Sequence, residues 1–318
     1  MKVRWPVLGV ASAVTAAAVM SGLILRSPRA PAPPPATHAI LADLAGFPNS
    51  ANTGVPDGTT LLAVPGDVSG GPGWHFDSRG WVVVDGDHAV LRGLYIPCNV
   101  DVTASDVTIE DVQVVTGGGS SIGISLRHTD DVTIKDTTIS GLNSSRGRVM
   151  AGIKDIYGDS TGIAIFRDDI SRAETGVQIE SGLVQDSYIH NSGYLDGDHV
   201  NGVTSNGGNP RLLTIEHNTI LIDRDQTDAI GLFEDFGVQA NRVITGNMLG
   251  GGGYAIYAGQ DPGGPPTSNI VITNNKISTR YYANGGLYGY VTQYNPGGPG
   301  NTWLGNTWNA TAQLVLNP

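Results

Sequence analysis

Acidic residues recur in one pattern in two segments of the chain. The sequences DGDHVN (residues 196–201) and DRDQTD (residues 223–228) both read D-x-D-x-x-[N/D], and they start 27 residues apart. If the two segments lie on neighbouring parallel strands, about 4.8 Å apart, their counterparts stack in three pairs: Asp196 with Asp223, Asp198 with Asp225, and Asn201 with Asp228. Like charges at that spacing repel each other, so the pattern requires a bound cation, a raised pKa or a basic neighbour.

Three interpretations of these acidic residues remain open. In the first, Ca²⁺ binds the carboxylates, since this ion prefers oxygen ligands. Its ligands would be Asp196, Asp198, Asp223, Asp225 and Asp228. In the second, paired carboxylates and His199 form an acid–base site that cleaves a sugar polymer. In the third, they are solvated turn residues, because Asp and Asn favour turns for purely local reasons.

A row of polar and aromatic residues accompanies the acidic residues. Lys154, Gln178 and Thr204 each follow an apolar residue at the same place in successive repeats, so we expect them to point outward in a line. Tyrosines continue the row, and a sugar chain lying there would meet their flat apolar rings. The catalytic candidates are Lys154, Asp198, His199 and Asp228. The substrate-binding candidates are Gln178, Asn201, Thr204, Glu234, Asp235, Tyr254 and Tyr257.

These residues belong to a chain that is built from one repeated line. Its clearest copies span residues 132–139, 213–220 and 270–277, where apolar and polar residues alternate and β-branched residues dominate. This alternation predicts strands, and repeats of 19 to 31 residues with no helical period between them predict a solenoid. The equivalent apolar positions are Ile109, Ile134, Ile165, Val184, Ile215, Ile244, Ile272 and Trp303.

A second set of apolar residues keeps nearly the same spacing. Its expected centres are Ile124, Ile153, Val177, Val203, Ile230, Ile256 and Leu287. Asn218, Asn247, Asn275 and Asn306 also share one place in consecutive repeats, so we expect them to form a hydrogen-bonded ladder. The predicted fold is an all-β, single-stranded, right-handed parallel β-helix of about eight coils with terminal caps.

The two ends of the chain differ from its middle. A basic start is followed by an apolar run from Val7 to Leu25, which is typical of an export signal and is also long enough to be an uncleaved membrane anchor. We expect a secreted or cell-surface protein that contacts the membrane only if this run is not cleaved. The predicted parts are a signal peptide or anchor (1–30), a Pro/Ala-rich linker (31–43), an N-terminal cap (44–79), the β-helix (80–290) and a C-terminal cap (291–318).

The charge balance limits the partners. The chain has 18 Lys and Arg against 29 Asp and Glu, a formal net charge of -11. Nucleic-acid binding needs clustered Lys and Arg on one face, so no nucleic-acid partner is expected. We expect a monomer whose partner is a polysaccharide.

The repeat resembles the right-handed parallel β-helix proteins of the pectate-lyase-like superfamily, in particular exported actinobacterial members. The resemblance covers residues 80–290 through the recurring Ile-x-x-Asn-x-Ile, and the segments GFPN (46–49) and NTGVP (52–56) are similar to the start of such proteins. It implies polysaccharide lyases, glycoside hydrolases, epimerases, or binding and adhesion proteins. Some relatives carry His-x-Asp-Gly-Ile where this chain has HVNGV (199–203). Asn201 then replaces an acid, so the role of that acid would either be lost in this chain or pass to Asp198 or Asp228.

The expected function is lyase-type cleavage of a uronate-containing glycan. The chain lacks the hydrolase set of Asn-Thr-Asp, Asp-Asp, Gly-His-Gly and Arg-x-Lys found in polygalacturonase-like β-helices, which favours β-elimination over hydrolysis. In a lyase, Lys154 or His199 would remove the proton α to the uronate carboxyl, and a cation such as Ca²⁺ or a basic side chain would stabilise the enolate. A non-catalytic glycan-binding or cell-surface module and a glycoside hydrolase remain the alternatives.

Overall fold

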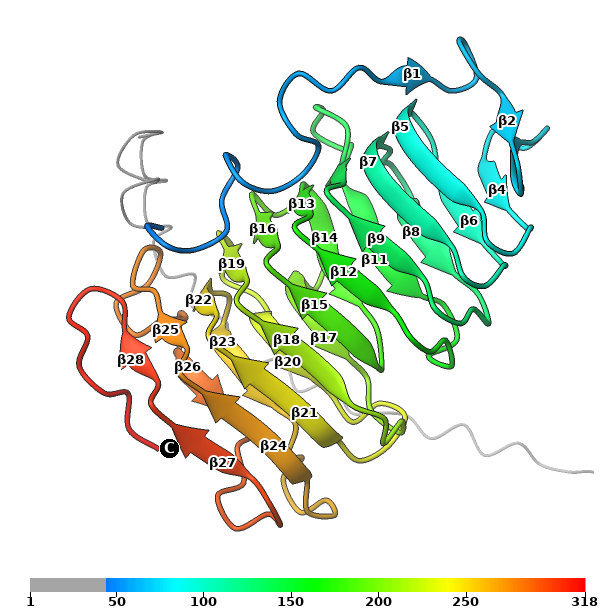
Figure 1. Ribbon diagram of the computed structural model, residues 1–318. Helices are drawn as coiled ribbons and strands as arrows, with labels where there is room; N and C mark the ends of the chain where they lie inside the picture. The colour runs from blue at the N-terminus through cyan, green and yellow to red at the C-terminus, as the bar shows by residue number, and fades with distance from the viewer. Residues whose placement is uncertain (1–43, 318) are drawn as a thin grey trace, which may run out of the picture. The chain divides into compact units, whose positions relative to one another are not determined.

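The protein is a stack of short strands wound into a parallel β-solenoid, seen here in a computed structural model that describes residues 44–317 (Figure 1). The predicted segments 1–30 and 31–43 lie outside the described residues. Residues 44–317 contain 28 strands and no helix. Accordingly, no membrane-spanning helix is found among them.

The strands form three ladders, to which most turns contribute one strand each. Ladder A contains β9 (Thr133–Lys135), β12 (Ala164–Phe166), β15 (Gly182–Gln185), β18 (Leu213–Glu216), β21 (Ala240–Thr245), β24 (Ser268–Thr273) and β27 (Thr302–Leu304). Ladder B contains β10 (Thr138–Ser140), β13 (Asp169–Ser171), β16 (Tyr188–His190), β19 (Thr219–Ile222), β22 (Met248–Gly251), β25 (Lys276–Ile277) and β28 (Thr307–Trp308). The long strands β5 (Val90–Ile96) and β7 (Thr108–Val115) join the two ladders at their N-terminal end.

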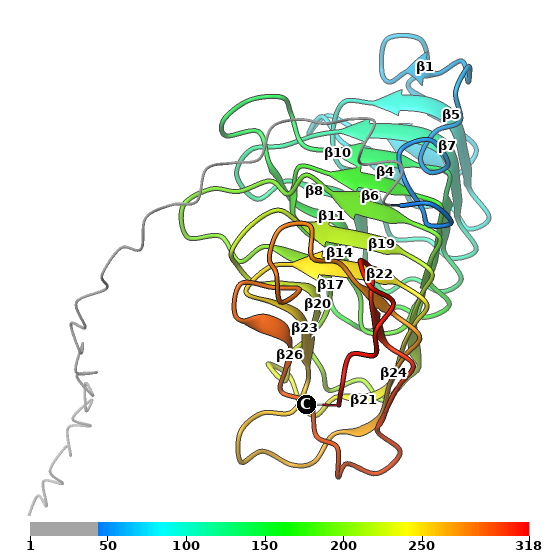
Figure 2. The same ribbon diagram turned by 90° about the vertical axis from the view of Figure 1, so that its left-hand side faces the viewer.

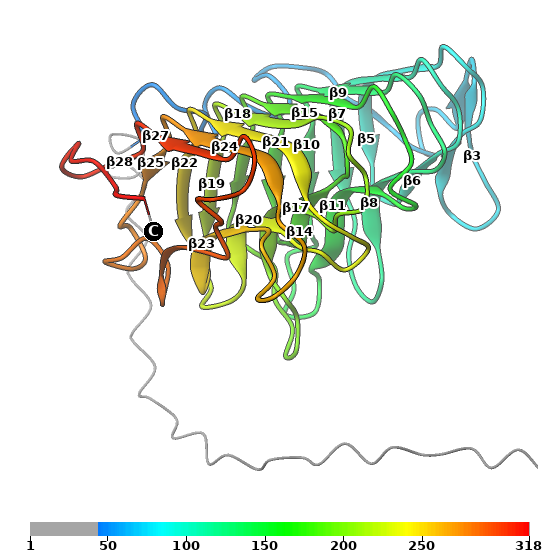
Figure 3. The same cartoon turned by 90° about the horizontal axis from the view of Figure 1, so that it is seen from below.

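Ladder C carries most of the predicted site residues. Its parallel strands are β4 (Val82–Val84), β6 (Val100–Val102), β8 (Ile122–Leu126), β11 (Val149–Asp155), β14 (Ala173–Gln178), β17 (Asn201–Ser205), β20 (Asp228–Leu232), β23 (Tyr254–Ala258) and β26 (Gly289–Thr292). Figures 2 and 3 show β11, β14, β17, β20 and β23 side by side in chain order. With about nine turns, the solenoid has one turn more than the sequence predicts.

The predicted register of the apolar positions is confirmed at all but one of them. In ladder A each predicted residue pairs with the next, from Ile109 to Trp303. In ladder C the pairing holds from Ile124 to Ile256. The prediction of Leu287 is wrong, because Ile256 pairs with Val291. The backbone of Leu287 instead donates to Gly252, upstream of β23, so Leu287 lies in a turn and is 42% exposed.

The two ends are closed in different ways. β2 (Gly70–Gly71) and β3 (Trp74–Phe76) add antiparallel strands to the edge of β4, while β1 (Leu62–Ala63) pairs with β5. The preceding residues 44–60 do not lie over that end but run along the side of the stack, where the Phe47 ring stacks on His217 at 5.5 Å. At the other end, the Trp303 indole donates to the carbonyl of Val315 at 3.0 Å.

Polar groups inside the turns are satisfied by the predicted asparagine ladder. Each of the four asparagines is at most 1% exposed. The side-chain amide of Asn218 donates to Asn247 at 3.0 Å, and Asn247 and Asn275 continue the chain at 2.9 Å. Each amide also donates to a backbone carbonyl of the preceding turn. Asn247, for example, donates at 2.8 Å to the carbonyl of Ile215, which lies three residues before Asn218, the equivalent asparagine of that turn. The ladder therefore joins successive turns through a buried line of hydrogen bonds.

An aspartate extends the same line toward the N-terminus. Asp168 accepts a hydrogen bond from the backbone of Thr137 at 2.7 Å, while its own backbone donates to Ser187 at 3.1 Å. Its second carboxyl oxygen is buried without a partner. Burial raises the pKa of Asp168 well above its ordinary value, so a neutral group is favoured at a position where later turns use a neutral amide.

We predict that Asp168→Asn stabilises the protein at pH 7. By the geometry of the other rungs, the new amide would donate to the carbonyl of Ile134, for a gain of about 1–2 kcal/mol. Because the raised pKa makes the wild-type stability fall as pH rises above the ordinary value of 3.8, the gain should shrink toward pH 4. Chemical denaturation at pH 4 and pH 7 measures both effects.

Asn247→Asp is the matched control for this prediction. This substitution places a buried acid at a position of the asparagine ladder where the wild type has a neutral amide. The free energy of unfolding of the variant should therefore fall below that of the wild type as pH rises. An Asp168→Asn variant that is less stable than the wild type at pH 7 would contradict the proposed role of the neutral acid.

Candidate functional site

The row predicted on ladder C has the predicted register, but Thr204 in it is only 4% exposed, and its hydroxyl donates to the carbonyl of Gly231 at 3.0 Å. Lys154 pairs with Gln178 and Gln178 with Thr204 on successive strands. Thr204 then pairs with Gly231, which pairs with Tyr257. The row therefore begins with the cation Lys154 and continues with the polar residues Gln178 and Thr204. Gly231 contributes no side chain, and the next residue of the row is the aromatic Tyr257.

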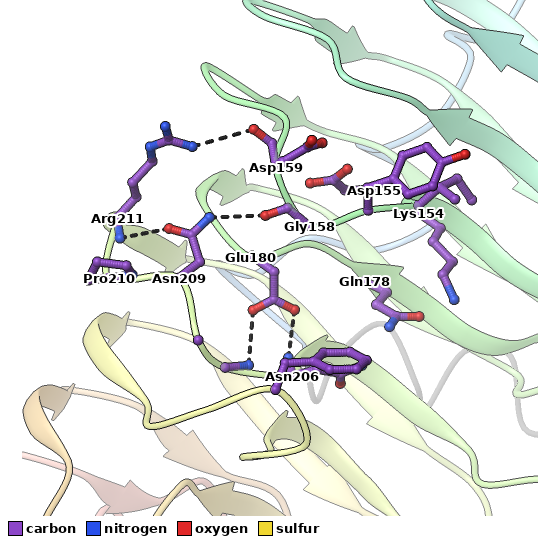
Figure 4. Close-up of a pocket in the computed structure, with 15 residues that line it drawn as sticks. Lys154, Asp155, Gly158, Asp159, Gln178, Glu180, Asn206, Asn209, Pro210 and Arg211 are labelled. Atoms are coloured by element: carbon purple, nitrogen blue, oxygen red, sulfur yellow. Dashed lines mark hydrogen bonds between the residues drawn. The ribbon is translucent and has the colours of Figure 1, made fainter. Parts of the chain in front are cut away.

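A cleft of about 810 Å³ lies where the first part of this row meets the turns that follow ladder C (Figure 4). Lys154, Asp155 and Gln178 come from the strands, while residues 156–159 and 206–211 come from two turns. The lining residues are Lys154, Asp155, Ile156, Tyr157, Gly158, Asp159, Gln178, Glu180, Asn206, Gly207, Gly208, Asn209, Pro210, Arg211 and Phe236. The sequence predicts only Lys154 and Gln178 among them, because the turns do not follow the repeat.

Lys154 is the lining residue best suited to accept a proton. Burial lowers the pKa of its ammonium group, and the charge of Glu174 opposes this shift only in part. No hydrogen bond or ion pair holds the side chain of Lys154 or of Gln178 among residues 44–317. A lysine with a depressed pKa and no carboxylate partner can act as a base closer to neutral pH than a solvated lysine.

Two of the three carboxylates that line the cleft, Asp155 and Glu180, hold its turns in place. Glu180 accepts hydrogen bonds from the backbone of Asn206 at 2.7 Å, the backbone of Gly207 at 3.1 Å and the Ser205 hydroxyl at 2.7 Å. Asp155 accepts bonds from the backbone and hydroxyl of Ser160 at 3.1 and 3.0 Å. Because both carboxylates are already bound in this way, neither is placed as a free nucleophile.

Aromatic side chains stand at the rim of the cleft. The Tyr157 ring is 57% exposed and stacks on His128 with centroids 4.2 Å apart. His128 in turn pairs with Asp159 at 2.6 Å. Phe236 is 77% exposed. Exposed aromatic rings beside polar groups are the surfaces on which sugar rings pack. The repeat gave no signal for these residues, because they lie in turns that do not follow it.

Asp198 is part of an ion-pair network outside the cleft. Arg148 donates to both of its oxygens at 2.5 and 2.7 Å, and the backbone of Leu195 donates at 2.7 Å. Although burial acts in the opposite direction, the hydrogen bonds from Arg148 and Leu195 hold the pKa of Asp198 below its ordinary value. Arg148 also pairs with Glu174 at 2.8 Å. Arg148 is thus the basic neighbour that compensates the charge of Asp198. Because its carboxylate is held in this pair, Asp198 is poorly placed for acid–base catalysis. Next to Asp198 in the chain, His199 is exposed.

The other predicted calcium ligands do not gather around one point. Asp196 and Asp225 are exposed, and Asp223 accepts a hydrogen bond from the backbone of Ser192 at 2.9 Å. Asp228 is fully buried. These residues, together with the paired Asp198, do not fit a shared Ca²⁺ ion. Within residues 44–317 the one cluster of three metal-type side chains is Glu110, Asp111 and Asp136, and Arg or Lys residues pair with Glu110 and Asp136.

Asp228 lies on ladder C beneath aromatic rings. Neither of its oxygens has a partner, and burial raises its pKa well above the ordinary value. It pairs in register with Asn201, as predicted. The Tyr257 ring lies 5.5 Å from Tyr254 and 5.7 Å from Phe233. The register thus brings Asn201, Asp228 and these rings together.

The last two predicted substrate-binding residues lie in the turn after β20. Glu234 accepts a hydrogen bond from the backbone of Gln239 at 3.2 Å, and Asp235 is exposed. Neither of them lines the cleft.

We predict that Asp198→Ala destabilises the fold. Both members of the pair are nearly buried, with side-chain exposures of 11% for Arg148 and 10% for Asp198, so removal of one charge should lower the free energy of unfolding by about 3 kcal/mol. Since the pKa of Asp198 is depressed, this contribution is present above pH 3.8 and is lost as pH falls through the depressed value. Asp196→Ala, in the same loop but exposed, should change stability by less than about 0.5 kcal/mol. Equal stabilities for the two variants at pH 7 would refute this role.

Comparisons with known proteins give no relative for this chain. No family model matches it, and neither a curated protein nor a solved structure does. The structure shows a parallel β-solenoid with a cleft on ladder C.

Proposed function

We propose that the cleft binds a uronate-containing polysaccharide and cleaves it by β-elimination, with Lys154 as the base. The observation that carries this proposal is the half-buried, unpaired Lys154, which lines a cleft with exposed Tyr157 and Phe236. The repeat's resemblance to the pectate-lyase-like superfamily agrees with this choice of substrate class. The protein would act outside the cytoplasm, consistent with its apolar N-terminal run.

The proposed reaction begins with proton transfer to Lys154. The neutral amine takes the proton from the carbon next to the uronate carboxyl, and the electron pair left behind forms a double bond as the adjacent bond to the glycosidic oxygen breaks. The departing oxygen then takes a proton from the lysine ammonium or from water, so protons and electrons balance. Gln178 pairs in register with Lys154, and its amide has no hydrogen-bond partner within residues 44–317, so it would donate a hydrogen bond to the substrate.

A lyase is favoured over a hydrolase by the state of the carboxylates. Hydrolysis usually requires two carboxyl groups that face the glycosidic bond, one of them as a proton donor. In this cleft Asp155 and Glu180 are occupied by hydrogen bonds to the turns. The cleft therefore does not offer two free carboxyl groups that face each other, whereas Lys154 is available as a base.

A non-catalytic glycan-binding module is the second candidate. It is favoured by the aromatic group of Tyr254, Tyr257 and Tyr288, which lies on later turns than Lys154 and includes a 68% exposed ring at Tyr288. Rings so placed support binding without contributing to proton transfer. A module of this kind would bind glycan and release no product.

We predict that Lys154→Ala abolishes formation of unsaturated uronate while glycan binding persists. The activity should rise with pH and level off below 10.5, the ordinary lysine pKa, because the pKa of Lys154 is lowered. Ultraviolet absorbance on a panel of uronate polymers, with and without chelator, measures the activity and tests calcium dependence at the same time.

Lys135→Ala is the matched control for Lys154→Ala. Lys135 lies on ladder A, where it pairs with Glu110 at 3.1 Å, so its removal should leave activity unchanged. Full activity of Lys154→Ala would exclude this residue as the base. Glycan binding by the wild type without product on every polymer would favour the binding module.

A further inference from the structure

The wall of the cleft opposite Lys154 depends on one fully buried arginine. Arg242, on β21, is 0% exposed. Its Nε donates to Gln239 at 2.8 Å, and one terminal nitrogen donates to the carbonyls of Arg211 at 2.8 Å and Ala240 at 2.7 Å. The other donates to the carbonyl of Asn209 at 2.9 Å and to the Ser205 hydroxyl at 3.3 Å. All five N–H groups of the guanidinium thus have acceptors.

The buried charge of Arg242 faces Glu180. The nearest oxygen of Glu180 lies 3.9 Å from Arg242, and this carboxylate also binds the backbone of Asn206 and Gly207. Burial lowers the pKa of Arg242 to about 10, an effect that Glu180 opposes, so the guanidinium is charged at neutral pH. One buried ion pair therefore fixes both ends of the turn 206–211, Glu180 at its start and Arg242 at its end.

The residue that this turn presents to the cleft is Arg211. Its backbone carbonyl is held by Arg242, and its backbone N–H donates to the side chain of Asn209 at 3.0 Å. Asn209 in turn donates to the carbonyl of Gly158 at 3.0 Å, which links the turn to the opposite wall. The exposed guanidinium of Arg211 makes one long bond, 3.4 Å, to the carbonyl of Asp159. Figure 4 shows Arg211 and Lys154 on opposite sides of the cleft.

We infer that Arg211 recognises a carboxylate of the bound glycan and that Arg242 and Glu180 are positioning residues that hold it there. Arg211 is the one arginine among residues 44–317 that lines the cleft, and no ion pair of its guanidinium is found there. The three carboxylates of the cleft have other partners: Asp155 binds Ser160, Asp159 pairs with His128, and Glu180 binds the backbone of Asn206. A guanidinium binds a carboxylate through two parallel hydrogen bonds, which a neutral sugar or a methyl ester does not accept in the same way. This inference rests on the proposed function, because it identifies the cleft group that distinguishes acidic from neutral glycan.

The first test compares an acidic oligogalacturonide with its methyl ester in a direct binding assay. The wild type should bind the acid more tightly, and Arg211→Gln should reduce that preference about 10- to 100-fold while binding of the ester changes little. Arg211→Lys should restore part of the preference. Arg167→Gln, a surface arginine paired with Asp136 on ladder A, is the matched control and should leave the preference intact. An unchanged preference in Arg211→Gln would overturn the recognition role.

The second test measures positioning without any glycan. Amide hydrogen exchange at Asn206 and Gly207, slow in the wild type because Glu180 accepts both bonds, should become at least about tenfold faster in Glu180→Ala. Arg242→Lys keeps the charge but has only three donors, so exchange should quicken across residues 206–211 and the acid preference should weaken. Unchanged exchange in both variants would overturn the positioning role.

The two tests also separate this inference from the proposed function. A wild type that binds neither oligosaccharide refutes the proposed function and, with it, the role of Arg211, while the exchange experiment still decides how the turn is held. Binding of both oligosaccharides with equal affinity refutes the recognition role alone. Loss of product formation in Lys154→Ala with an intact acid preference supports both assignments.

Discussion

Every turn of this protein must close onto the next one in register, and that requirement governs the rest of the structure. The backbone groups of one turn find partners only on its neighbours, so a slip by one residue would move the apolar side chains out of the interior. Inside the stack, Asn218, Asn247, Asn275 and Asn306 satisfy backbone groups that water does not reach. A buried line of this kind fixes register more strictly than apolar contact does, since an unpaired amide in the core is destabilising.

The cleft exists because turns, unlike strands, are free of this requirement. The segments between ladder C and ladder A vary in length from turn to turn, and residues 156–159 and 206–211 of these segments line the cleft. Such turns need their own support. Here it comes from buried polar groups, with Asp155 under one turn and Glu180 with Arg242 under the other. The solenoid supplies a flat row of side chains, and the supported turns give it walls.

Acidic residues in this chain have several distinct roles that depend on their surroundings. Asp198 is ionised beside Arg148, whereas burial favours the neutral form of Asp168 within the polar ladder. Asp228 is also buried, but beneath aromatic rings and without a partner. Their pKa shifts run in opposite directions because desolvation opposes charge while a paired guanidinium stabilises it. A count of acidic residues, or their spacing, does not distinguish these cases.

The sequence by itself determined the solenoid, the register of its apolar positions and the order of the row that Lys154 and Gln178 begin on ladder C. Ile134, Ile215 and Ile272 show why: a strand in a stacked solenoid has a fixed inward side, and the repeat records it directly. The same register correctly placed Asn201 beside Asp228 and Lys154 beside Gln178.

Only the tertiary structure decided which of those side chains share a site. Leu287 fell outside the ladder because its backbone bonds to an earlier turn. Arg148 reached Asp198 from 50 residues away, and Arg242 reached the cleft wall from the following turn of ladder A. Long side chains and irregular turns find their partners across the stack, where geometry and desolvation select among many possible contacts. The repeat pattern does not predict which of these contacts form.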